Sequence, residues 1–519
     1  MDSDYFDDSD SSVEIEYTRR HIRRISSSDD SEDDQRVVNT DFVWKPQNYT
    51  PIAHSFSGVS GVIANTQNLS RREVFELFFN EELVRKIVSE TNKYGATNAD
   101  FVPITDDELK VFIALNILMS LVPKPTIQSY WSKDKSIETP YFKNVITRNR
   151  FIYIATNLRF ASNDISNDPL IKIREVSDII RKNFIRMYVP NKNISINESL
   201  MQCKSRLHYI QFIRNKRARF GIKFYKLYDS KTRYIHNFKI YVRKDRTNAG
   251  SASRNVVINL LKESRLLYKG YCLFIDNWYS SPTLYRELYN MQTNVCGTVR
   301  INRKGMPREL KFLQLEEGEA AVFSTTDMAA IKWKDKKDVI LLTTMHRLDF
   351  AETEKTNRYT RKKMLKPTVV IDYNKNMGGV DVGDQMLSKF HTMRRCEKAY
   401  KKIFFYFIDM MLQNSYIIFK NNKKDRAFHV YKQRLAEEII EKYLANVRVR
   451  DASSINDSLT RYTGQHFPIR IPPTLARGNK TSKRCVVCLA MLVRKETVFK
   501  CDVCDVALCI DHFKKYHVK

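Results

Sequence analysis

The chain has 519 residues, 43% of them apolar, which is enough for two to four domains with hydrophobic cores. Its formal net charge is +29. Residues 1–40 hold twelve acidic residues and five arginines, so the rest of the chain carries +36. Such a basic region indicates a polyanionic partner such as nucleic acid rather than an inert basic surface. It shows no run of about 18 apolar residues and no secretory segment, so we expect an intracellular protein that does not span a membrane.

The first 69 residues are acidic, rich in Ser and poor in apolar residues, so we expect a disordered tail at 1–69. Serines followed by acids, as in "SSSDDSEDD", would suit an acid-directed kinase.

Helices are expected next. Ser70–Glu73 and Thr105–Glu108 ("SRRE" and "TDDE") fit capping boxes, and apolar residues at helical spacing follow each of them. The second of these helices should end before Pro123. The pattern predicts a helical domain over 70–190.

Strands dominate from residue 191 to 301. "NISINESLMQ" reads as a strand, a hairpin is expected across Asp229–Thr232, and "GYCLFIDNWYSS" reads as a buried strand with a polar end. Helical patterns in "NVVINLLKES" and "SPTLYRELYNM" alternate with these strands, which predicts a mixed α/β core. Residues 302–366 are charged and broken, and we interpret them as an insertion.

The core is expected to resume at 367–390, where "PTVVIDYNKNMGGVDVGDQM" predicts a strand, a glycine turn and a helix. Helical segments should fill 391–465. A polar linker at 466–484 then leads to a cysteine-rich segment at 485–519.

Acidic residues mark a candidate catalytic site. Asp276 closes a buried strand, where α/β folds place chemistry, although a turn or cap role is as plausible from the sequence. Asp381 and Asp384 open a helix with both carboxylates on one face, or else compensate the helix dipole.

The cysteine-rich segment has metal-ligand spacing. In cross-brace order, Cys485, Cys488, Cys509 and His512 complete one zinc tetrahedron. Cys501, Cys504 and His517 give only three ligands to a second zinc, which must borrow a ligand, hold water or bind weakly. The other cysteines, Cys203, Cys272, Cys296 and Cys396, are expected to be reduced core thiols. A ubiquitin-ligase RING is the rival interpretation, and the short spacing disfavours it.

Several blocks together resemble the piggyBac family of DNA transposases. They are "SYWS" with "ETPYF", "RNKRARFGIKFY", "FIDNWYSS", "CGTVRINRKGMP", "DYNKNMGGVDVGDQM" and the cysteine-rich end. The resemblance implies an RNase H-like α/β core with an inserted domain, a helical DNA-binding and dimerisation domain, and a cross-brace zinc domain. It also implies a nuclear dimer that acts on double-stranded DNA at TTAA targets.

In this family three aspartates hold two divalent metals, Mg²⁺ or Mn²⁺, for strand cleavage. The resemblance places the second at Asp276 and the third at Asp381, with Asp384 beside it, but the first falls on Asn197. An amide is neutral and cannot be a bidentate anionic ligand. Glu198 should point to the opposite face of the strand, so we expect it not to substitute.

Two basic runs are candidates for DNA binding. Lys216, Arg217, Arg219 and Lys223 precede the hairpin, and the resemblance places this segment near the DNA; Arg394 and Arg395 follow the third acid. Such groups would contact phosphates, and the alternative for either run is a solvated face.

The sequence therefore predicts a transposase-derived DNA-binding protein that is catalytically impaired at Asn197. Two alternatives remain open. One is an active cut-and-paste transposase that tolerates the asparagine, and the other is a zinc-dependent interaction module for chromatin proteins.

Overall fold

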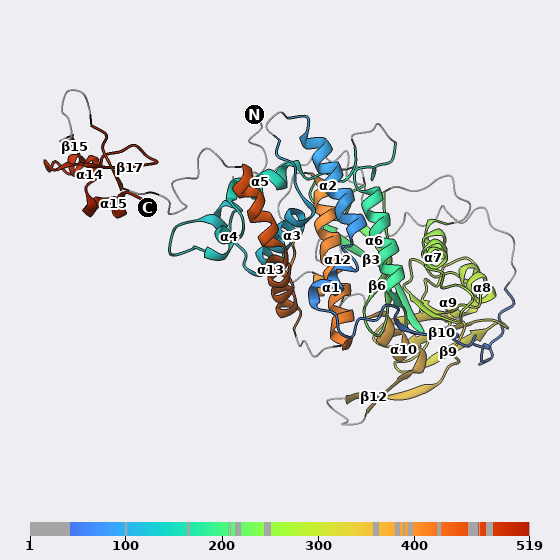
Figure 1. Cartoon of the computed structure of the whole chain (residues 1–519). Coiled ribbons are helices and arrows are strands. Elements are labelled where there is room, and N and C mark those ends of the chain that lie inside the picture. The colour runs from blue at the N-terminus through green and yellow to red at the C-terminus, as the bar shows by residue number, and fades with distance from the viewer. Residues whose placement is uncertain are drawn as a thin grey trace. The chain divides into compact units, whose positions relative to one another are not determined.

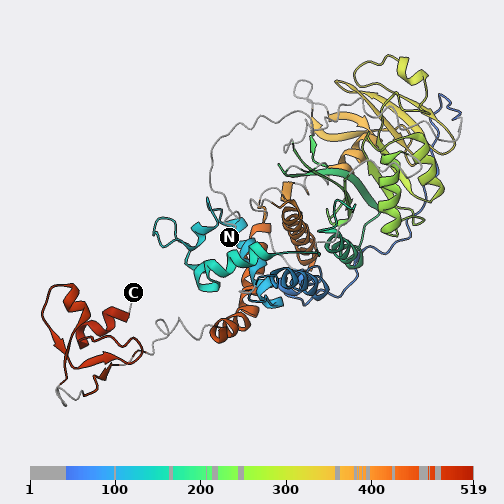
Figure 2. The same cartoon turned by 90° about the horizontal axis from the view of Figure 1, so that it is seen from above.

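The computed structural model describes residues 42–98, 101–162, 167–205, 207, 209–212, 220–242, 251–356, 363–378, 383, 385–387, 390–392, 398–422, 427–454, 466, 468–473 and 481–517. They belong to two compact units that divide between Lys442 and Tyr443. Figure 1 and Figure 2 show the elements of each unit from two directions. Among the described helices, none is long and apolar enough to cross a membrane.

The first helices of the larger unit are coloured blue to green in Figure 1. They are α1 (Arg71–Glu76), α2 (Glu81–Gly95), α3 (Asp106–Leu121), the 3₁₀ helix η1 (Gln128–Trp131), α4 (Pro140–Val145), α5 (Arg148–Asn157) and α6 (Arg174–Met187). Both predicted capping boxes are present, since Ser70 and Thr105 each exchange hydrogen bonds with the glutamate three residues on. Helix α3 ends at Leu121, before Pro123, as the sequence predicted.

A nine-stranded sheet forms the centre of this unit. Its strands are β3 (Asn193–Gln202), β4 (Gln211–Phe212), β5 (Phe220–Asp229), β6 (Ile235–Ile240), β7 (Cys272–Ile275), β8 (Asn294–Thr298), β9 (Ala320–Ser324), β10 (Ala329–Lys334) and β11 (Asp338–Thr343). The order is β4-β5-β3-β7-β8-β11-β10-β9, with β6 also paired to β5. The predicted β5–β6 hairpin is confirmed, and β3 pairs antiparallel with β5 but parallel with β7.

Helices cover both faces of the sheet. On one face, α7 (Ala252–Glu263) and α8 (Pro282–Asn290), both predicted, pack on Ile194 and Ile196 of β3. On the other, α10 (Thr368–Met377) packs on Cys272 and Phe274 of β7. Two long helices, α12 (Ala399–Asn422) and α13 (Phe428–Ser454), follow in the predicted helical region, and α9 (Glu309–Phe312) is a single short turn. The core is thus a mixed α/β sheet between helical layers.

The predicted insertion is not separate from the core. Strands β9, β10 and β11 continue the same sheet, because β11 pairs with the open edge of β8. Only β12 (Phe350–Thr356) and β13 (Lys363–Pro367) form a hairpin of their own. Charged residues on the outer strands made this region read as broken in the sequence.

The strand predicted within 367–373 is wrong. Residues Thr368–Met377 form helix α10 instead, although Val369, Val370 and Ile371 are β-branched. Val369, Val370 and Met377 are buried together against the sheet, a spacing that suits a helix face. Tertiary packing has overridden local propensity here.

Order begins earlier than the sequence predicted, because residues 42–69 pack on the core. The indole of Trp44 donates to the Gly305 carbonyl at 2.8 Å, and Lys45 bridges to Ser324 of β9. β1 (Gly61–Val62) pairs with β2 (Tyr188–Val189). Residues 1–41, with the predicted kinase serines, lie outside the described residues.

The smaller unit contains β14 (Pro468–Arg470), β15 (Lys483–Arg484), α14 (Val486–Ala490), β16 (Glu496–Thr497), β17 (Phe499–Cys501) and α15 (Ile510–His517). β14 pairs with β17 and β15 with β16, although both β14 and β15 fall in the predicted linker. The described part of 466–484 therefore belongs to the cysteine-rich unit and is not a free connector.

Candidate catalytic face and metal centres

Asn197 and Asp276 lie side by side on two neighbouring parallel strands, Asn197 in the middle of β3 and Asp276 directly after the end of β7. β3 and β7 are in register at Ile196 and Ile275, so the next residue along each is Asn197 or Asp276. The carboxyl end of a buried parallel strand such as β7 is where α/β folds place their chemistry. The structure thus brings these two predicted positions together.

Asp276 is a largely buried carboxylate at the end of β7. Its Oδ1 accepts a hydrogen bond from the Trp278 amide at 2.9 Å. Burial raises the pKa of its carboxyl group, and the negative charge of Glu198 raises it further, against the opposing effects of the Trp278 amide and Lys223. A cation next to this carboxyl group would stabilise its ionised form and so lower its pKa.

Asn197 shares its face of the sheet with a buried lysine. Lys226 of β5 is its direct partner in the antiparallel register, and such partners point to the same face. Lys226 is fully buried, and its ammonium donates to the Tyr406 hydroxyl of α12 at 2.8 Å. The Asn197 amide oxygen accepts from the Glu198 backbone at 2.8 Å.

Gly383, the described residue between Asp381 and Asp384 in the sequence, lies against this same face. Gly383 is buried beside Tyr228 of β5 and Gln413 of α12, so that an added Cβ would stand 3.1 Å from the Tyr228 ring. Tyr228 is two residues along β5 from Lys226 and so points the same way. Asp381 and Asp384 themselves lie outside the described residues.

Of the predicted metal-binding positions, the structure therefore describes Asn197 and Asp276, and only Asp276 is an anion. A pair of divalent ions needs several anionic ligands. With a neutral amide at one position and a buried ammonium across from it, these described residues do not fit such a pair. No cleavage step through a metal follows from them.

Lys223, predicted to contact DNA, is buried. Its ammonium forms an ion pair with Glu198 and lies 4.6 Å from the centroid of the Trp278 ring. Only 5% of the residue is exposed, so the structure corrects this prediction: the charge is held inside the fold. Glu198 is meanwhile the acid whose charge acts on Asp276, a role that strand alternation did not indicate. The other predicted DNA contacts, Lys216, Arg217, Arg219, Arg394 and Arg395, lie outside the described residues.

The first predicted zinc set comes together as expected. The ligand atoms of Cys485, Cys488, Cys509 and His512 all lie within 4.8 Å of one another. The Sγ atoms of Cys488 and Cys509 are 3.9 Å apart, and His512 Nδ1 is 3.4 Å from Cys509 Sγ. Zinc bonds of about 2.3 Å to sulfur and 2.0–2.1 Å to nitrogen, at tetrahedral angles, give about 3.8 Å and 3.6 Å for these separations. The residues fit the metal.

Ionisation of the first set is favoured at Cys485. Burial opposes the thiolate, but amide hydrogen bonds from Cys488 and Cys509 and the contact with His512 outweigh it and lower the pKa of the Cys485 thiol to about 6. A thiolate is the form that binds zinc. By contrast, burial raises the pKa of the core thiol Cys272 above its ordinary value.

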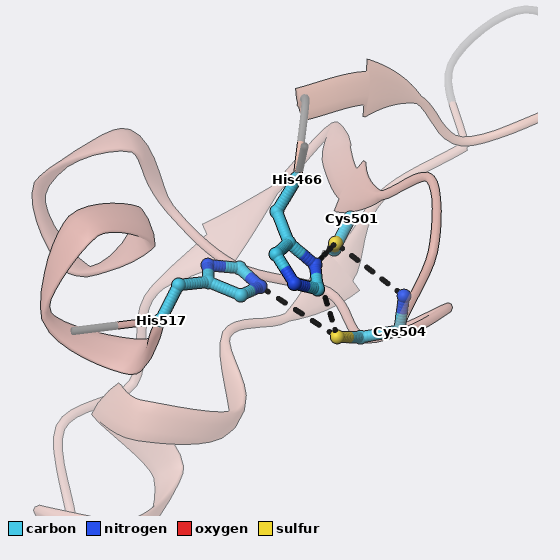
Figure 3. Close-up of side chains that lie close together, drawn as sticks. All are labelled: His466, Cys501, Cys504 and His517. Carbon is cyan, nitrogen blue, oxygen red and sulfur yellow. Dashed lines mark hydrogen bonds between the residues drawn. The ribbon is translucent and has the colours of Figure 1, made fainter. Parts of the chain in front are cut away.

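The second set has four members, not the three that the spacing motif predicted. His466 lies with Cys501, Cys504 and His517, all four ligand atoms within 4.8 Å of one another (Figure 3). His466 stands 35 residues before Cys501, in the stretch interpreted as linker, and no spacing motif indicated it.

Comparison with known proteins agrees with this architecture. The protein-family model described as "Transposase IS4" matches residues 70–416. The chain is 25% identical over 466 residues to human PiggyBac transposable element-derived protein 3, covering 86% of this chain and 76% of that protein. It is also 25% identical over 402 residues to human PiggyBac transposable element-derived protein 2, covering 73% and 67% of the two chains.

A solved structure shares the fold. It is the cryo-EM structure of a piggyBac transposase synaptic complex with hairpin DNA, and the TM-score is 0.67 at 22% sequence identity. The likeness covers 88% of this chain and 98% of that one. Taken with the family match over residues 70–416, it shows that the chain belongs to the Transposase IS4 family and, within it, to the piggyBac-type proteins.

Proposed function

We propose that this chain is a transposase-derived DNA-binding protein whose strand-cleaving chemistry is impaired. The observation that carries the proposal is the pair formed by Asn197 and Lys226. A neutral amide stands where the family resemblance places the first metal-binding aspartate, and a buried ammonium faces it across β3 and β5. A neutral amide and a buried ammonium both weaken the attraction of that face for divalent cations.

The proposed partner is duplex DNA that resembles a transposon end and contains TTAA. The net charge of +29 supports this, as does the structural relative, a piggyBac transposase in a synaptic complex with hairpin DNA. We also propose that the protein acts as a dimer in the nucleus. Zinc is the metal proposed for the cysteine-rich unit, because paired thiolates and imidazoles at these separations suit it.

The test is a cleavage assay on the full-length protein in Mg²⁺ or Mn²⁺. The substrate is a DNA duplex that carries the ends flanking the gene and a TTAA sequence. The variants are wild type, Asn197→Asp, Lys226→Met and the double variant. Binding is measured in parallel by gel shift, so that loss of cleavage is separated from loss of binding. We expect every variant to bind, wild type not to cut, and the double variant to cut best.

Cleavage by wild type at the rate of the double variant would overturn the impairment. Failure of any variant to bind DNA would overturn the binding half of the proposal. If all bind and none cuts, impairment stands but extends beyond these two positions.

An active transposase is the second candidate, and one observation favours it. The charge of Glu198 raises the pKa of Asp276, so a second carboxylate acts on the same position despite the loss at Asn197. Under this function wild type cuts, and Glu198→Gln abolishes cutting while DNA binding persists. Lys226→Met, which leaves the Glu198–Lys223 ion pair intact, serves as the comparison.

A further inference from the structure

The second cysteine and histidine group draws one ligand from outside the cysteine-rich run. Figure 3 shows the rings of His466 and His517 beside the sulfurs of Cys501 and Cys504. His466 Nδ1 lies 3.3 Å from Cys501 Sγ and 3.5 Å from Cys504 Sγ. His517 Nε2 lies 3.7 Å from Cys504 Sγ. A single imidazole nitrogen facing two sulfurs at nearly equal distance points to a common centre.

These separations are those of a tetrahedral zinc site. Zinc bonds of about 2.3 Å to sulfur and 2.0–2.1 Å to nitrogen place adjacent ligand atoms about 3.6 Å apart. The observed separations, 3.3, 3.5 and 3.7 Å, bracket that value. The convergence of all four ligand atoms within 4.8 Å of one another, two sulfurs and two imidazole nitrogens, is what points to a metal.

The surrounding hydrogen bonds orient the ligands as metal sites require. His517 Nδ1 lies 2.7 Å from the Phe513 carbonyl, so this nitrogen donates and Nε2 is left with a lone pair toward Cys504. The Cys504 amide donates to Cys501 Sγ at 3.4 Å, which ties the two thiol side chains into one turn. The two histidine rings stack with centroids 4.4 Å apart.

The backbone that carries His466 is tied to the unit. Strand β14 pairs with β17 so that Pro468, two residues after His466, stands opposite Cys501. The Ile471 amide continues the pairing by donating to the Val498 carbonyl at 2.9 Å. The position of His466 next to Cys501 therefore follows from the strand register.

We propose that His466 is the fourth ligand of a second zinc ion, with Cys501, Cys504 and His517. The ion joins the segment at 466–473 to the cysteine-rich segment, so the unit begins at His466 and not at Cys485. Two thiolates neutralise this zinc, whereas three leave the first site with one net negative charge. The inference is independent of DNA binding and cleavage.

The test is zinc content of the full-length protein by elemental analysis. We expect two zinc ions per chain in wild type and one in His466→Ala. His466→Cys keeps a ligand and should restore two, and His429→Ala, which changes an exposed histidine of α13, should retain two. Cys485→Ala should remove the other ion, giving one.

Cobalt substitution gives a readout that a merely structural histidine would not change. In wild type the thiolate-to-cobalt absorption should come from all five cysteines of the two groups, and in His466→Ala the share of Cys501 and Cys504 should be lost. Two zinc ions in His466→Ala, or one in wild type, would overturn the proposal. If His466→Ala loses both ions, restoration by His466→Cys supports it and failure to restore overturns it.

Discussion

A single pair of side chains changes the electrostatics of the candidate catalytic face. Two divalent cations held by carboxylates gain several kcal/mol from each negative ligand at an effective dielectric constant near 20. Asn197 removes one unit of negative charge, and Lys226, its fully buried partner on β5, adds one unit of positive charge. Because each 1.36 kcal/mol is about tenfold in rate, the proposed impairment would follow from the two together. The substitution Asn197→Asp alone would leave the Lys226 ammonium facing the same position.

Buried His236 of β6 should make the larger unit sensitive to mild acid. Burial lowers the pKa of its imidazole to about 4, from 6.5 in an exposed chain. Between these values the unfolded chain binds the proton and the folded chain does not, so stability is lost as pH falls from 6.5 toward 4. We expect about 2 kcal/mol of this loss between pH 7 and pH 5, measured by urea unfolding, and His236→Phe should remove it.

Tryptophan fluorescence isolates the unit that contains His236. All four tryptophans, Trp44, Trp131, Trp278 and Trp333, precede the boundary at Lys442. The same loss between pH 7 and pH 5 in wild type and in the variant would show that other groups carry the acid sensitivity.

Single residues at the site were predictable where one strand or one motif identifies them. Asp276 and the first zinc set needed only local pattern and spacing, and Asn197 was identified through the family resemblance. Lys226 and His466 were not predictable, because their roles follow from pairings: β3 with β5, and β14 with β17. The register between strands that are distant in the chain cannot be inferred from any short stretch of sequence.

At the scale of one element, the N-terminal cap of α3 should contribute measurably to stability. The Thr105 hydroxyl accepts from the Glu108 amide at 3.2 Å, and the Glu108 carboxylate accepts from the Thr105 amide at 3.3 Å. Glu108 also forms an ion pair with Arg150 at 2.7 Å. Thr105→Ala should lower the free energy of unfolding by about 1 kcal/mol, read from urea unfolding by tryptophan fluorescence.

Thr105→Ser is the matched control because it keeps the oxygen that caps the helix. It should retain most of the stability that alanine loses. Equal losses in both variants would assign the effect to the threonine methyl group and not to the cap.

Elements were predictable where local signals and packing agree. The capping boxes and the β5–β6 hairpin are such cases. Helix α10 is the opposite case, since its β-branched residues favour a strand while the sheet beneath it offers a helix a buried face. The sequence did not indicate that strands β9 to β11 extend the core sheet, because the open edge of β8 with which β11 pairs exists only in the folded sheet.

At the scale of the whole molecule, charge should make DNA binding depend steeply on salt. The chain carries +29 overall, whereas residues 1–40, with twelve acidic residues and five arginines, are locally net negative. A protein that contacts about six phosphates loses about 10³ in affinity between 50 and 200 mM salt, and we expect a fall of that order in gel-shift titrations. An affinity that does not change with salt would show that phosphate contacts do not dominate binding. Removal of the acidic residues 1–40 should raise the affinity for DNA at low salt.

The two compact units should also respond differently to loss of metal. Among its described residues the smaller unit has a small hydrophobic cluster around Cys485, Cys488, Leu508 and Cys509, so we expect its fold to depend on ligands, whereas the larger unit has an extended core. Incubation with EDTA should therefore speed hydrogen exchange across 481–517 and leave the urea midpoint of tryptophan fluorescence unchanged. Added zinc should restore protection. A shift of that midpoint with EDTA would mean that stability of the larger unit is coupled to metal binding, and unchanged exchange at 481–517 would mean that the smaller unit folds without it.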